Sequence, residues 1–242
     1  MYRIGMDVGS TFTKYCVMDD MSILSLKKEE TVLRQQQYFE RKIPELLSEY
    51  PGARVVSCGY GRFNVGAVKC TNELTALAKG CSYVTGKNGL VLDIGGQDTK
   101  IIRHQDGNLT GFFINDKCAA GSGMFLTAIL NRINSDFADI DLRGVTEPDI
   151  HLSSTCAVFA QSEIVELIAN NRTEAEIIQA VIWQIFIKAK ALINKVEDGP
   201  LLLSGGLTSL PGIASFAEKA VGRKCELSPY SAYFSAIGCA VM

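Results

Sequence analysis

Three apolar segments of this chain each end in a glycine turn, and two of these turns also carry a carboxylate. Residues 7–11 read Asp-Val-Gly-Ser-Thr, residues 93–97 read Asp-Ile-Gly-Gly-Gln, and a Gly-Gly pair closely follows the apolar residues 201–203. Glycine lets bare backbone amides approach phosphate oxygens closely, and hydroxyls beside such a turn can add hydrogen bonds. The turn residues are Asp7, Gly9, Ser10, Thr11, Asp93, Gly95, Gly96, Gln97, Gly205 and Gly206.

The two aspartates predict a cation at these turns, because a carboxylate would otherwise repel a phosphate. Asp7 and Asp93 therefore indicate Mg²⁺, held through water. The third turn, Gly205-Gly206, would let a flat base lie against the backbone. A single Asp-x-Gly is more often a plain tight turn, but three turns after three apolar strands favour a nucleotide site. The sequence has no P-loop motif, and no Gly-x-Gly-x-x-Gly follows a strand, so neither a P-loop enzyme nor a dinucleotide fold is supported.

The strands that must position these turns repeat along the chain. They are predicted at residues 2–8 and 13–18 around the first turn, and at residues 90–96 and 98–103 around the second. An Asp106-Gly107 hairpin turn leads into a further strand. The repetition indicates an internal duplication into two lobes of an α/β fold. The predicted lobes are residues 1–88 plus about 230–242, and residues 89–229.

The second half of the chain is expected to be mostly helical. Its clearest helix is predicted at about 174–196, where apolar residues recur at helical spacing and Thr173 with Glu176 predicts a capping box. Further helices are expected at about 35–50 and 72–83, near 121–123, near 154–156 and from 231.

Two of the eight cysteines precede predicted helix starts. Cys118 lies in a glycine-rich helix start and Cys156 in a serine-rich one. A helix N-terminus favours the thiolate, which is the form that binds soft metals. The alternative is that both cysteines are small buried core residues, but neither of these polar, small-residue segments needs a core residue. The other six are expected to be buried core thiols, namely Cys16, Cys58, Cys70, Cys81, Cys225 and Cys239.

Two thiolates are too few for a [4Fe-4S] cluster, which takes four. A two-fold symmetric dimer would supply two from each chain. The ligand count therefore suggests one cluster between two copies of the chain, with four helix N-termini facing it.

The three glycine turns resemble those of the superfamily of acetate kinases, sugar kinases, Hsp70 and actin. This resemblance implies two ribonuclease-H-like lobes with ATP in the cleft between them, and two phosphate loops and an adenosine loop at the three turns. Five motifs make the resemblance more specific. They are D-V-G-S-T at 7–11, G-Y-G-R at 59–62, D-I-G-G-Q-D-T-K at 93–100, N-D-K-C-A-A-G-S-G at 115–123 and S-S-T-C-A-V-F-A-Q-S-E at 153–163.

Together these motifs resemble the activators of 2-hydroxyacyl-CoA dehydratases, of the BadF/BadG/BcrA/BcrD type. That family includes ATPase subunits of benzoyl-CoA reductase and reductases of double-cubane-cluster proteins. The resemblance covers nearly the whole chain. It implies a homodimer with one bridging [4Fe-4S] cluster, reduced by an external donor such as ferredoxin or flavodoxin. Hydrolysis of bound MgATP to ADP then drives an electron uphill to the partner dehydratase or reductase.

The resemblance also implies site residues. Cys118 and Cys156 match the cluster ligands. Residues matched to catalytic positions are Asp7, Asp93, Gln97 and Glu73, and those matched to nucleotide-binding positions are Gly9, Ser10, Thr11, Lys14, Gly95, Gly96, Lys100, Gly205 and Gly206. Glu73 could orient the attacking water or be a carboxylate favoured at a helix start. Asp116 also matches the family pattern but could equally be a turn or cap residue, and Lys14 and Lys100 are more often solvated lysines.

The sequence departs from the family pattern at several positions, so the family pattern does not identify the partner protein. Ser122 and Ala157 each replace a usual Thr, and Gln161 replaces a usual Glu near the second cysteine. No ligand is lost, but the partner need not be a 2-hydroxyglutaryl-CoA dehydratase.

Two alternative functions remain for the chain. They are a small-molecule, sugar-type kinase of the same superfamily and a chaperone-like ATP-binding module.

Composition limits what else the chain could bind. Its 242 residues are 47% hydrophobic and 21% charged, with a formal net charge of −2 and basic residues spread along the chain. Neither a nucleic acid nor a membrane surface is therefore an expected partner. The sequence has no signal peptide and no long apolar run, so a cytoplasmic protein is expected.

Overall fold

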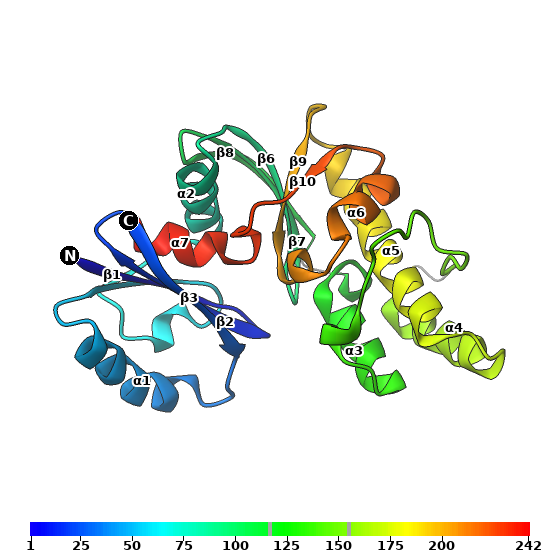
Figure 1. The fold of residues 1–242 in the computed structure, drawn as a ribbon, viewed down its shortest axis with the longest axis horizontal. Coiled ribbons are helices and arrows are strands. Elements are labelled where there is room, and N and C mark those ends of the chain that lie inside the picture. The colour runs from blue at the N-terminus through cyan, green and yellow to red at the C-terminus, as the bar shows by residue number, and fades with distance from the viewer. Residues whose placement is uncertain (116–117, 154–155) are drawn as a thin grey trace. The chain divides into compact units, whose positions relative to one another are not determined.

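The chain folds into two compact units, each built around a mixed sheet (Figure 1). A computed structural model describes residues 1–115, 118–153 and 156–242. Unit 1 comprises Met1–Asn88, Ile102–Gly111 and Ser228–Met242, and unit 2 comprises Gly89–Ile101 and Phe112–Leu227. Asp116, which the family pattern singled out, lies outside the described residues, as do the motif residues 117, 154 and 155.

The sheet of unit 1 has the order β3-β2-β1-β4-β5. Its strands are β1 (Tyr2–Val8), β2 (Phe12–Asp19), β3 (Ser22–Glu30), β4 (Arg54–Cys58) and β5 (Lys69–Cys70). β1 pairs antiparallel with β2 and parallel with β4, so the first glycine turn lies at the end of a central strand. β3 was not predicted, because its half-exposed, charge-rich sequence lacks the apolar run of a buried strand.

Helices cover both faces of this sheet (Figure 1). They are α1 (Gln35–Glu49), α2 (Glu73–Thr85) and α7 (Phe234–Ala240), with short 3₁₀ turns at η1 (Arg62–Asn64) and η5 (Ser231–Tyr233). α1 buries Phe39 and Leu46 in the cluster that contains Ile4, Met6 and Val8 of β1. α7 packs instead on Cys16 and Met18 of β2. Tyr15 and Val17 of β2 belong to the first cluster, so alternate residues of β2 pack into two separate cores, as the pleat of a strand requires.

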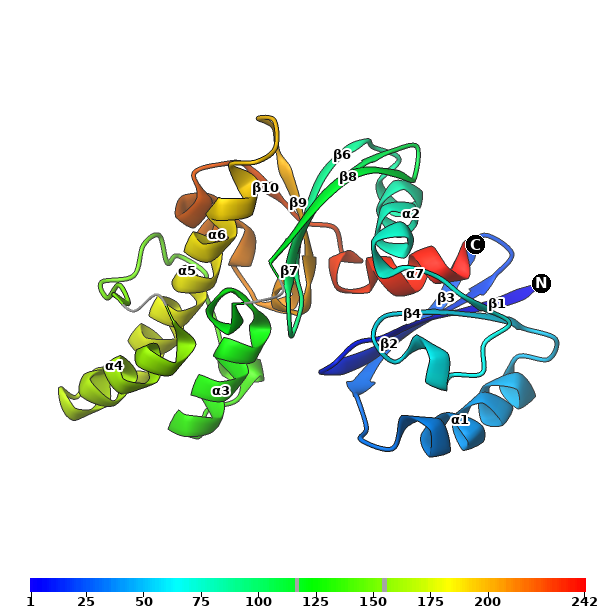
Figure 2. The same cartoon turned by 180° about the vertical axis from the view of Figure 1, so that it is seen from behind.

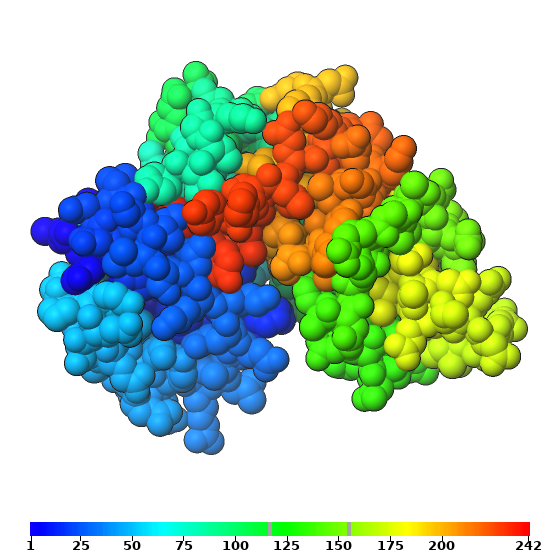
Figure 3. Space-filling view, viewed as in Figure 1, coloured from blue at the N-terminus to red at the C-terminus, as the bar shows by residue number. Residues whose placement is uncertain are grey.

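α2 and α7 cross with their backbones in close contact, and glycines make this possible. A Cβ on Gly80 would collide with the carbonyl oxygen of Phe234, and a Cβ on Gly238 with that of Ala76. Gly5 of β1 has the same relation to Ala236. Figure 3 shows the red C-terminal segment seated between the blue strands and the turquoise α2, in line with the complete burial of α7. A larger residue fits these three positions only if α7 moves away from α2 or from β1.

The second sheet has the order β10-β9-β6-β7-β8, and most of its residues lie in unit 2, while Ile102–Gly111 at the β7–β8 end belongs to unit 1. Its strands are β6 (Gly89–Ile94), β7 (Thr99–Gln105), β8 (Asn108–Asn115), β9 (Leu201–Gly205) and β10 (Cys225–Glu226). β6 pairs parallel with β9, and β9 with β10. The predicted hairpin turn between β7 and β8 is confirmed, with φ 50° at Asp106 and 71° at Gly107.

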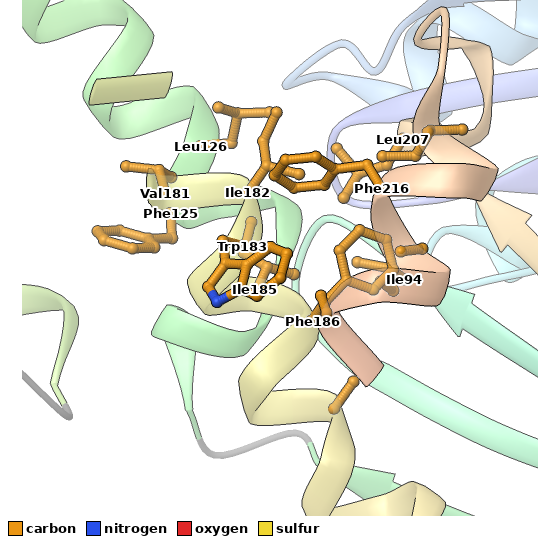
Figure 4. Close-up of a cluster of buried hydrophobic side chains, with 14 of the residues drawn as sticks. Ile94, Phe125, Leu126, Val181, Ile182, Trp183, Ile185, Phe186, Leu207 and Phe216 are labelled. Carbon is orange, nitrogen blue, oxygen red and sulfur yellow. The ribbon is translucent and has the colours of Figure 1, made fainter. Parts of the chain in front are cut away.

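One long helix organises the core of unit 2. The helices are α3 (Gly123–Ile133), α4 (Ala157–Ala169), α5 (Glu174–Ile193) and α6 (Ile213–Val221), with 3₁₀ turns η2 (Ala119–Gly121), η3 (Phe137–Asp139) and η4 (Gly206–Ser209). α5 starts with the predicted capping box of Thr173 and Glu176. Figure 2 shows α3, α5 and α6 on one side of the sheet. In Figure 4 Trp183 of α5 lies beside Phe216 of α6, with ring centroids 5.4 Å apart. Among the described residues, no helix is long and apolar enough to cross a membrane.

Candidate functional site

The first glycine turn joins β1 to β2 and assembles its predicted residues. The amide of Gly9 donates to the carbonyl of Phe12 at 3.1 Å, and the hydroxyl of Thr31 donates to the carbonyl of Gly9 at 2.9 Å. Ser10 is exposed and Thr11 half-buried at the tip of this hairpin. Thr31, which follows β3, therefore holds this turn, while Ser10 and Thr11 stay at least partly open to solvent.

Asp7 precedes this turn and is buried, with only 7% of the residue exposed. Lys14 lies opposite Asp7 on β2, and its Nζ is 3.8 Å from Asp7 Oδ2. Cys58 lies opposite on the other side, in β4, and its thiol donates to Asp7 Oδ1 at 3.7 Å. The strand pairing thus places a cation and a neutral donor on the two oxygens of one carboxylate. Sequence reasoning missed Cys58, because only the β1–β4 register brings it to Asp7.

Glu73 opens α2, and the preceding Asn72 caps this helix by accepting the amide of Leu74 at 2.8 Å. The charges of both Asp7 and Glu73 act on Cys58. A hydrogen bond with Cys239 and complete burial are the larger causes that raise the pKa of the Cys58 thiol. Both carboxylates predicted for the first half of the site therefore lie within electrostatic range of one buried neutral group.

The second glycine turn joins β6 to β7 and contains a buried ionic group. Lys100, which is 3% exposed, places its Nζ 3.1 Å from Asp93 Oδ2 and 2.8 Å from Asp98 Oδ1. The amide of Gly95 donates to the carbonyl of Asp98 at 2.9 Å, which closes the turn. Gln97 is exposed at the tip. Lys100 is thus a buried ion-pair partner and not a solvated strand lysine, and Asp98 is a further charged residue of this ionic group that the Asp-x-Gly pattern does not select.

The third glycine turn lies beside the second. In the parallel pairing of β6 with β9, Ile94 is opposite Gly205 and Asp93 is opposite Ser204. Gly205 has φ 102°, and a Cβ there would collide with the carbonyl of Ile94. The hydroxyl of Thr208 donates to the carbonyl of Gly205 at 2.7 Å. Both turns therefore follow the carboxyl ends of adjacent parallel strands, where α/β sheets bind ligands.

The two singled-out cysteines each precede a helical segment of unit 2. Cys156 is exposed and is the N-cap residue of α4. Cys118 is half-buried and is the N-cap residue of η2, so it precedes a 3₁₀ turn and not α3 itself, which begins at Gly123. Neither side chain makes a capping hydrogen bond, which leaves each sulfur uncommitted to its helix backbone.

The donor sets differ in how well they fit the expected groups. In the parts of the chain that the structure describes, no group of three or more His, Cys, Asp or Glu side chains could hold a metal ion. A complete four-thiolate site within one copy is therefore absent from those parts, whereas two thiols from each of two copies would match a [4Fe-4S] cluster. For Mg²⁺, Lys100 already lies between Asp93 and Asp98, so a cation there would be held through water by Asp93.

The other cysteines follow the prediction with one exception. Cys16, Cys58, Cys81, Cys225 and Cys239 are buried, but Cys70 is exposed, so that part of the prediction is wrong. Cys70 ends the two-residue edge strand β5, whose residues are both exposed. Burial raises the pKa of Cys16 and of Cys225 to about 12. These thiols stay protonated at neutral pH and suit a structural role.

The BadF/BadG/BcrA/BcrD ATPase family matches residues 4–242. The chain belongs to this family. Among curated relatives, an uncharacterised protein of Methanocaldococcus jannaschii is 34% identical over 224 residues, 91% of this chain and 92% of that protein. The (R)-2-hydroxyglutaryl-CoA dehydratase activating ATPase of Acidaminococcus fermentans is 31% identical over 252 residues, 100% of this chain and 96% of that protein.

Solved structures agree with this assignment. Component A of the Acidaminococcus fermentans (R)-2-hydroxyglutaryl-CoA dehydratase has a TM-score of 0.88 at 30% identity, covering 100% of this chain and 96% of that one. The activator of the 2-hydroxyisocaproyl-CoA dehydratase from Clostridium difficile, with bound ADPNP, has a TM-score of 0.87 at 27% identity, covering 100% and 93%. A glucokinase of Streptomyces griseus, 14% identical, shares the fold alone. The chain is an ATPase, and the predicted fold class of actin, Hsp70 and the sugar kinases is confirmed.

Proposed function

We propose that this ATPase is an activator that passes a low-potential electron from a [4Fe-4S] cluster to a partner 2-hydroxyacyl-CoA dehydratase or a related reductase, including a double-cubane-cluster protein. The observation that carries the proposal is the pair Cys118 and Cys156, each the N-cap residue of a helical segment in unit 2. The relatives named as dehydratase activators support the class of partner.

The nucleotide would be held by the three glycine turns. Gly9, Ser10 and Thr11 would bind phosphate oxygens in unit 1, and Gly95, Gly96 and Gln97 would do so in unit 2. Lys14 would partly neutralise the negative charge of Asp7, and Lys100 that of Asp93, since each lysine forms an ion pair with its aspartate. Gly205 and Gly206 would form one side of the adenosine site, since Gly205 lies beside Ile94 at the end of β6. Mg²⁺, held through water by the two aspartates, would neutralise charge on the phosphates during hydrolysis.

The cluster would lie between two copies of the chain. Two cysteines from each copy supply the four thiolates that it needs. Val158 and Phe159, 69% and 71% exposed, lie two and three residues after Cys156, in the first turn of α4. Large apolar side chains beside a ligand are typical of a surface that another chain covers. When bound, the cluster supplies the one-electron redox chemistry, accepting from a donor such as ferredoxin or flavodoxin.

The protein's own residues would orient and shield this group. The half-buried Cys118 packs against the core of unit 2, which limits how far its sulfur can move. The amides of Ala119 and Ala157, which follow the cysteines, are the first of each helical segment and would face an anion.

The eight free cysteines, none in a disulfide, support the cytoplasm as location. The composition continues to favour no nucleic-acid or membrane partner.

Iron and sulfide analysis after anaerobic reconstitution tests the proposal. Wild type should hold about four irons and about four sulfides per dimer. Cys118→Ser and Cys156→Ser should each lose them, whereas Cys70→Ser, which removes an exposed thiol elsewhere, should keep them. Iron-free wild type under the same conditions would refute the electron-transfer function. Phosphorylation of a sugar in air by a variant lacking both Cys118 and Cys156 would favour the kinase alternative.

A further inference from the structure

The second glycine turn holds the start of α3 through its carbonyl groups. The carbonyl of Gly95 accepts the amide of Gly123 at 2.8 Å, and that of Gly96 accepts the amide of Met124 at 2.9 Å. These amides belong to the first turn of a helix, which has no partners of its own for them. A Cβ on Gly123 would lie 3.1 Å from the carbonyl oxygen of Gly95, so the approach is close. The turn therefore acts as the cap of α3.

Thr99 adds a second connection from the same strand–turn unit. It is the first residue of β7, is only 1% exposed as a whole, and donates its hydroxyl to the carbonyl of Gly121. The amide of Gly121 in turn donates to the carbonyl of Cys118 at 3.1 Å. A continuous run of hydrogen bonds thus leads from Thr99 to the backbone of Cys118. We refer to residues 118–124 as the Cys118 segment.

The planar peptide bond links the amide groups on one side of this turn to the carbonyl groups on the other side. The carbonyl of Gly95 and the amide of Gly96 belong to one planar peptide unit, as do the carbonyl of Gly96 and the amide of Gln97. An amide that turns toward a phosphate necessarily rotates the carbonyl of its own unit. Phosphate contacts on one side of the turn are therefore coupled to the capping contacts of α3 on the other.

We propose that Thr99 is a positioning residue that links nucleotide occupancy of the second turn to the Cys118 segment. Its hydroxyl holds the end of η2 while the carbonyls of Gly95 and Gly96 hold the start of α3. Without the hydroxyl, the backbone beside Cys118 loses its link to β7, and a nucleotide at the turn orders only α3. This inference rests on the proposed placement of phosphates at the second turn.

Alkylation of Cys118 in iron-free, reduced protein measures the link directly. Iodoacetamide would be added with and without a saturating nonhydrolysable MgATP analogue, and the rate at each cysteine read by peptide mass spectrometry. In wild type the analogue should slow alkylation of Cys118 roughly fivefold, the factor that one hydrogen bond of about 1 kcal/mol gives. The exposed Cys156, outside the Cys118 segment, is the internal reference and should not change.

Three variants separate the hydroxyl from general packing. Thr99→Val keeps the shape but removes the donor, and should make alkylation of Cys118 faster and independent of nucleotide while nucleotide affinity stays unchanged. Thr99→Ser keeps the donor and should restore the nucleotide effect. Thr127→Val is the matched control, because the Thr127 hydroxyl also donates to a backbone carbonyl of this segment, that of Gly123 at 3.2 Å, but from within α3. It should behave as wild type.

Two results would overturn the inference. One is a wild-type rate at Cys118 that saturating nucleotide leaves unchanged. The other is a full nucleotide effect in Thr99→Val. If Thr99→Val does not fold, Gly123→Ala, which presses a methyl group on the carbonyl of Gly95, takes its place and should reduce the nucleotide effect. Because the assay needs no iron, failure of cluster assembly would refute the proposed function while leaving this result standing.

Discussion

Lys100 Nζ lies 3.1 Å from Asp93 Oδ2 inside unit 2, and the same ammonium lies 2.8 Å from Asp98 Oδ1. One buried cation thus holds two buried carboxylates together. Lys100→Met should reduce the free energy of unfolding of unit 2 by about 3–5 kcal/mol, since removing one partner leaves buried charge uncompensated. Urea unfolding followed by fluorescence of Trp183, the chain's one tryptophan, measures this. Lys219→Met, at an exposed lysine of the same unit, should change stability by less than about 0.5 kcal/mol.

Asp93 should matter more for hydrolysis than for nucleotide binding. Asp93→Asn removes the charge that would hold Mg²⁺ through water, so Mg²⁺-dependent ATPase activity should fall by about tenfold to a hundredfold. Binding of ATP without Mg²⁺ should be kept or improved, because one repulsive charge is gone. Asp141→Asn, which removes an exposed carboxylate paired with Arg143, should leave both unchanged. Equal ATPase rates in Asp93→Asn and wild type would contradict the placement of Mg²⁺.

The glycine contacts between α2 and α7 should be intolerant of a single methyl group. Gly238→Ala should destabilise unit 1 by about 3 kcal/mol or more, because the new Cβ would collide with the backbone of Ala76. Thermal unfolding by circular dichroism would register this change. Gly111→Ala is the control, since an added Cβ there meets nothing within 4 Å and should have little effect. A Gly238→Ala protein as stable as Gly111→Ala would disprove the close contact.

Burial of Cys16 predicts an alkaline loss of stability. The folded pKa is raised from 9.0 to about 12, chiefly by burial, so above pH 9 the unfolded chain loses a proton that the folded chain retains. The stabilisation is complete below pH 9 and declines as the pH rises toward 12, by about 1.4 kcal/mol per pH unit. Cys16→Ala should remove this contribution and flatten the dependence. Urea midpoints at several alkaline pH values compare the two slopes, and parallel curves would refute the prediction.

Local patterns were enough to predict the strands around the glycine turns and the helix with its capping box. Asp7, Asp93 and the turn glycines could be selected because strand–turn chemistry is written in consecutive residues. The same holds for Cys156, which stands at the N-cap position of α4 as expected. Their roles toward nucleotide and cluster stay predictions.

Features that depend on register or distant packing could not be predicted in this way. Cys58 reaches Asp7 only through the parallel pairing of β1 with β4. Thr99 has no signature as a donor to Gly121, since its partner lies in another segment. Gly80 and Gly238 each look like a weak helix residue until the two helices are placed together. The short 3₁₀ turn that separates Cys118 from α3 was likewise hidden within a glycine-rich run.

Unit 1 is assembled from three separate stretches, and the last of them, Ser228–Met242, supplies α7. The ribosome makes Cys16 and Met18 early, yet the helix that covers them is made after all of unit 2. Translation order therefore favours folding of the Phe112–Leu227 stretch while one face of the first sheet waits uncovered. A nascent chain that stalls before residue 228 would present that apolar face to chaperones or to other unfinished chains.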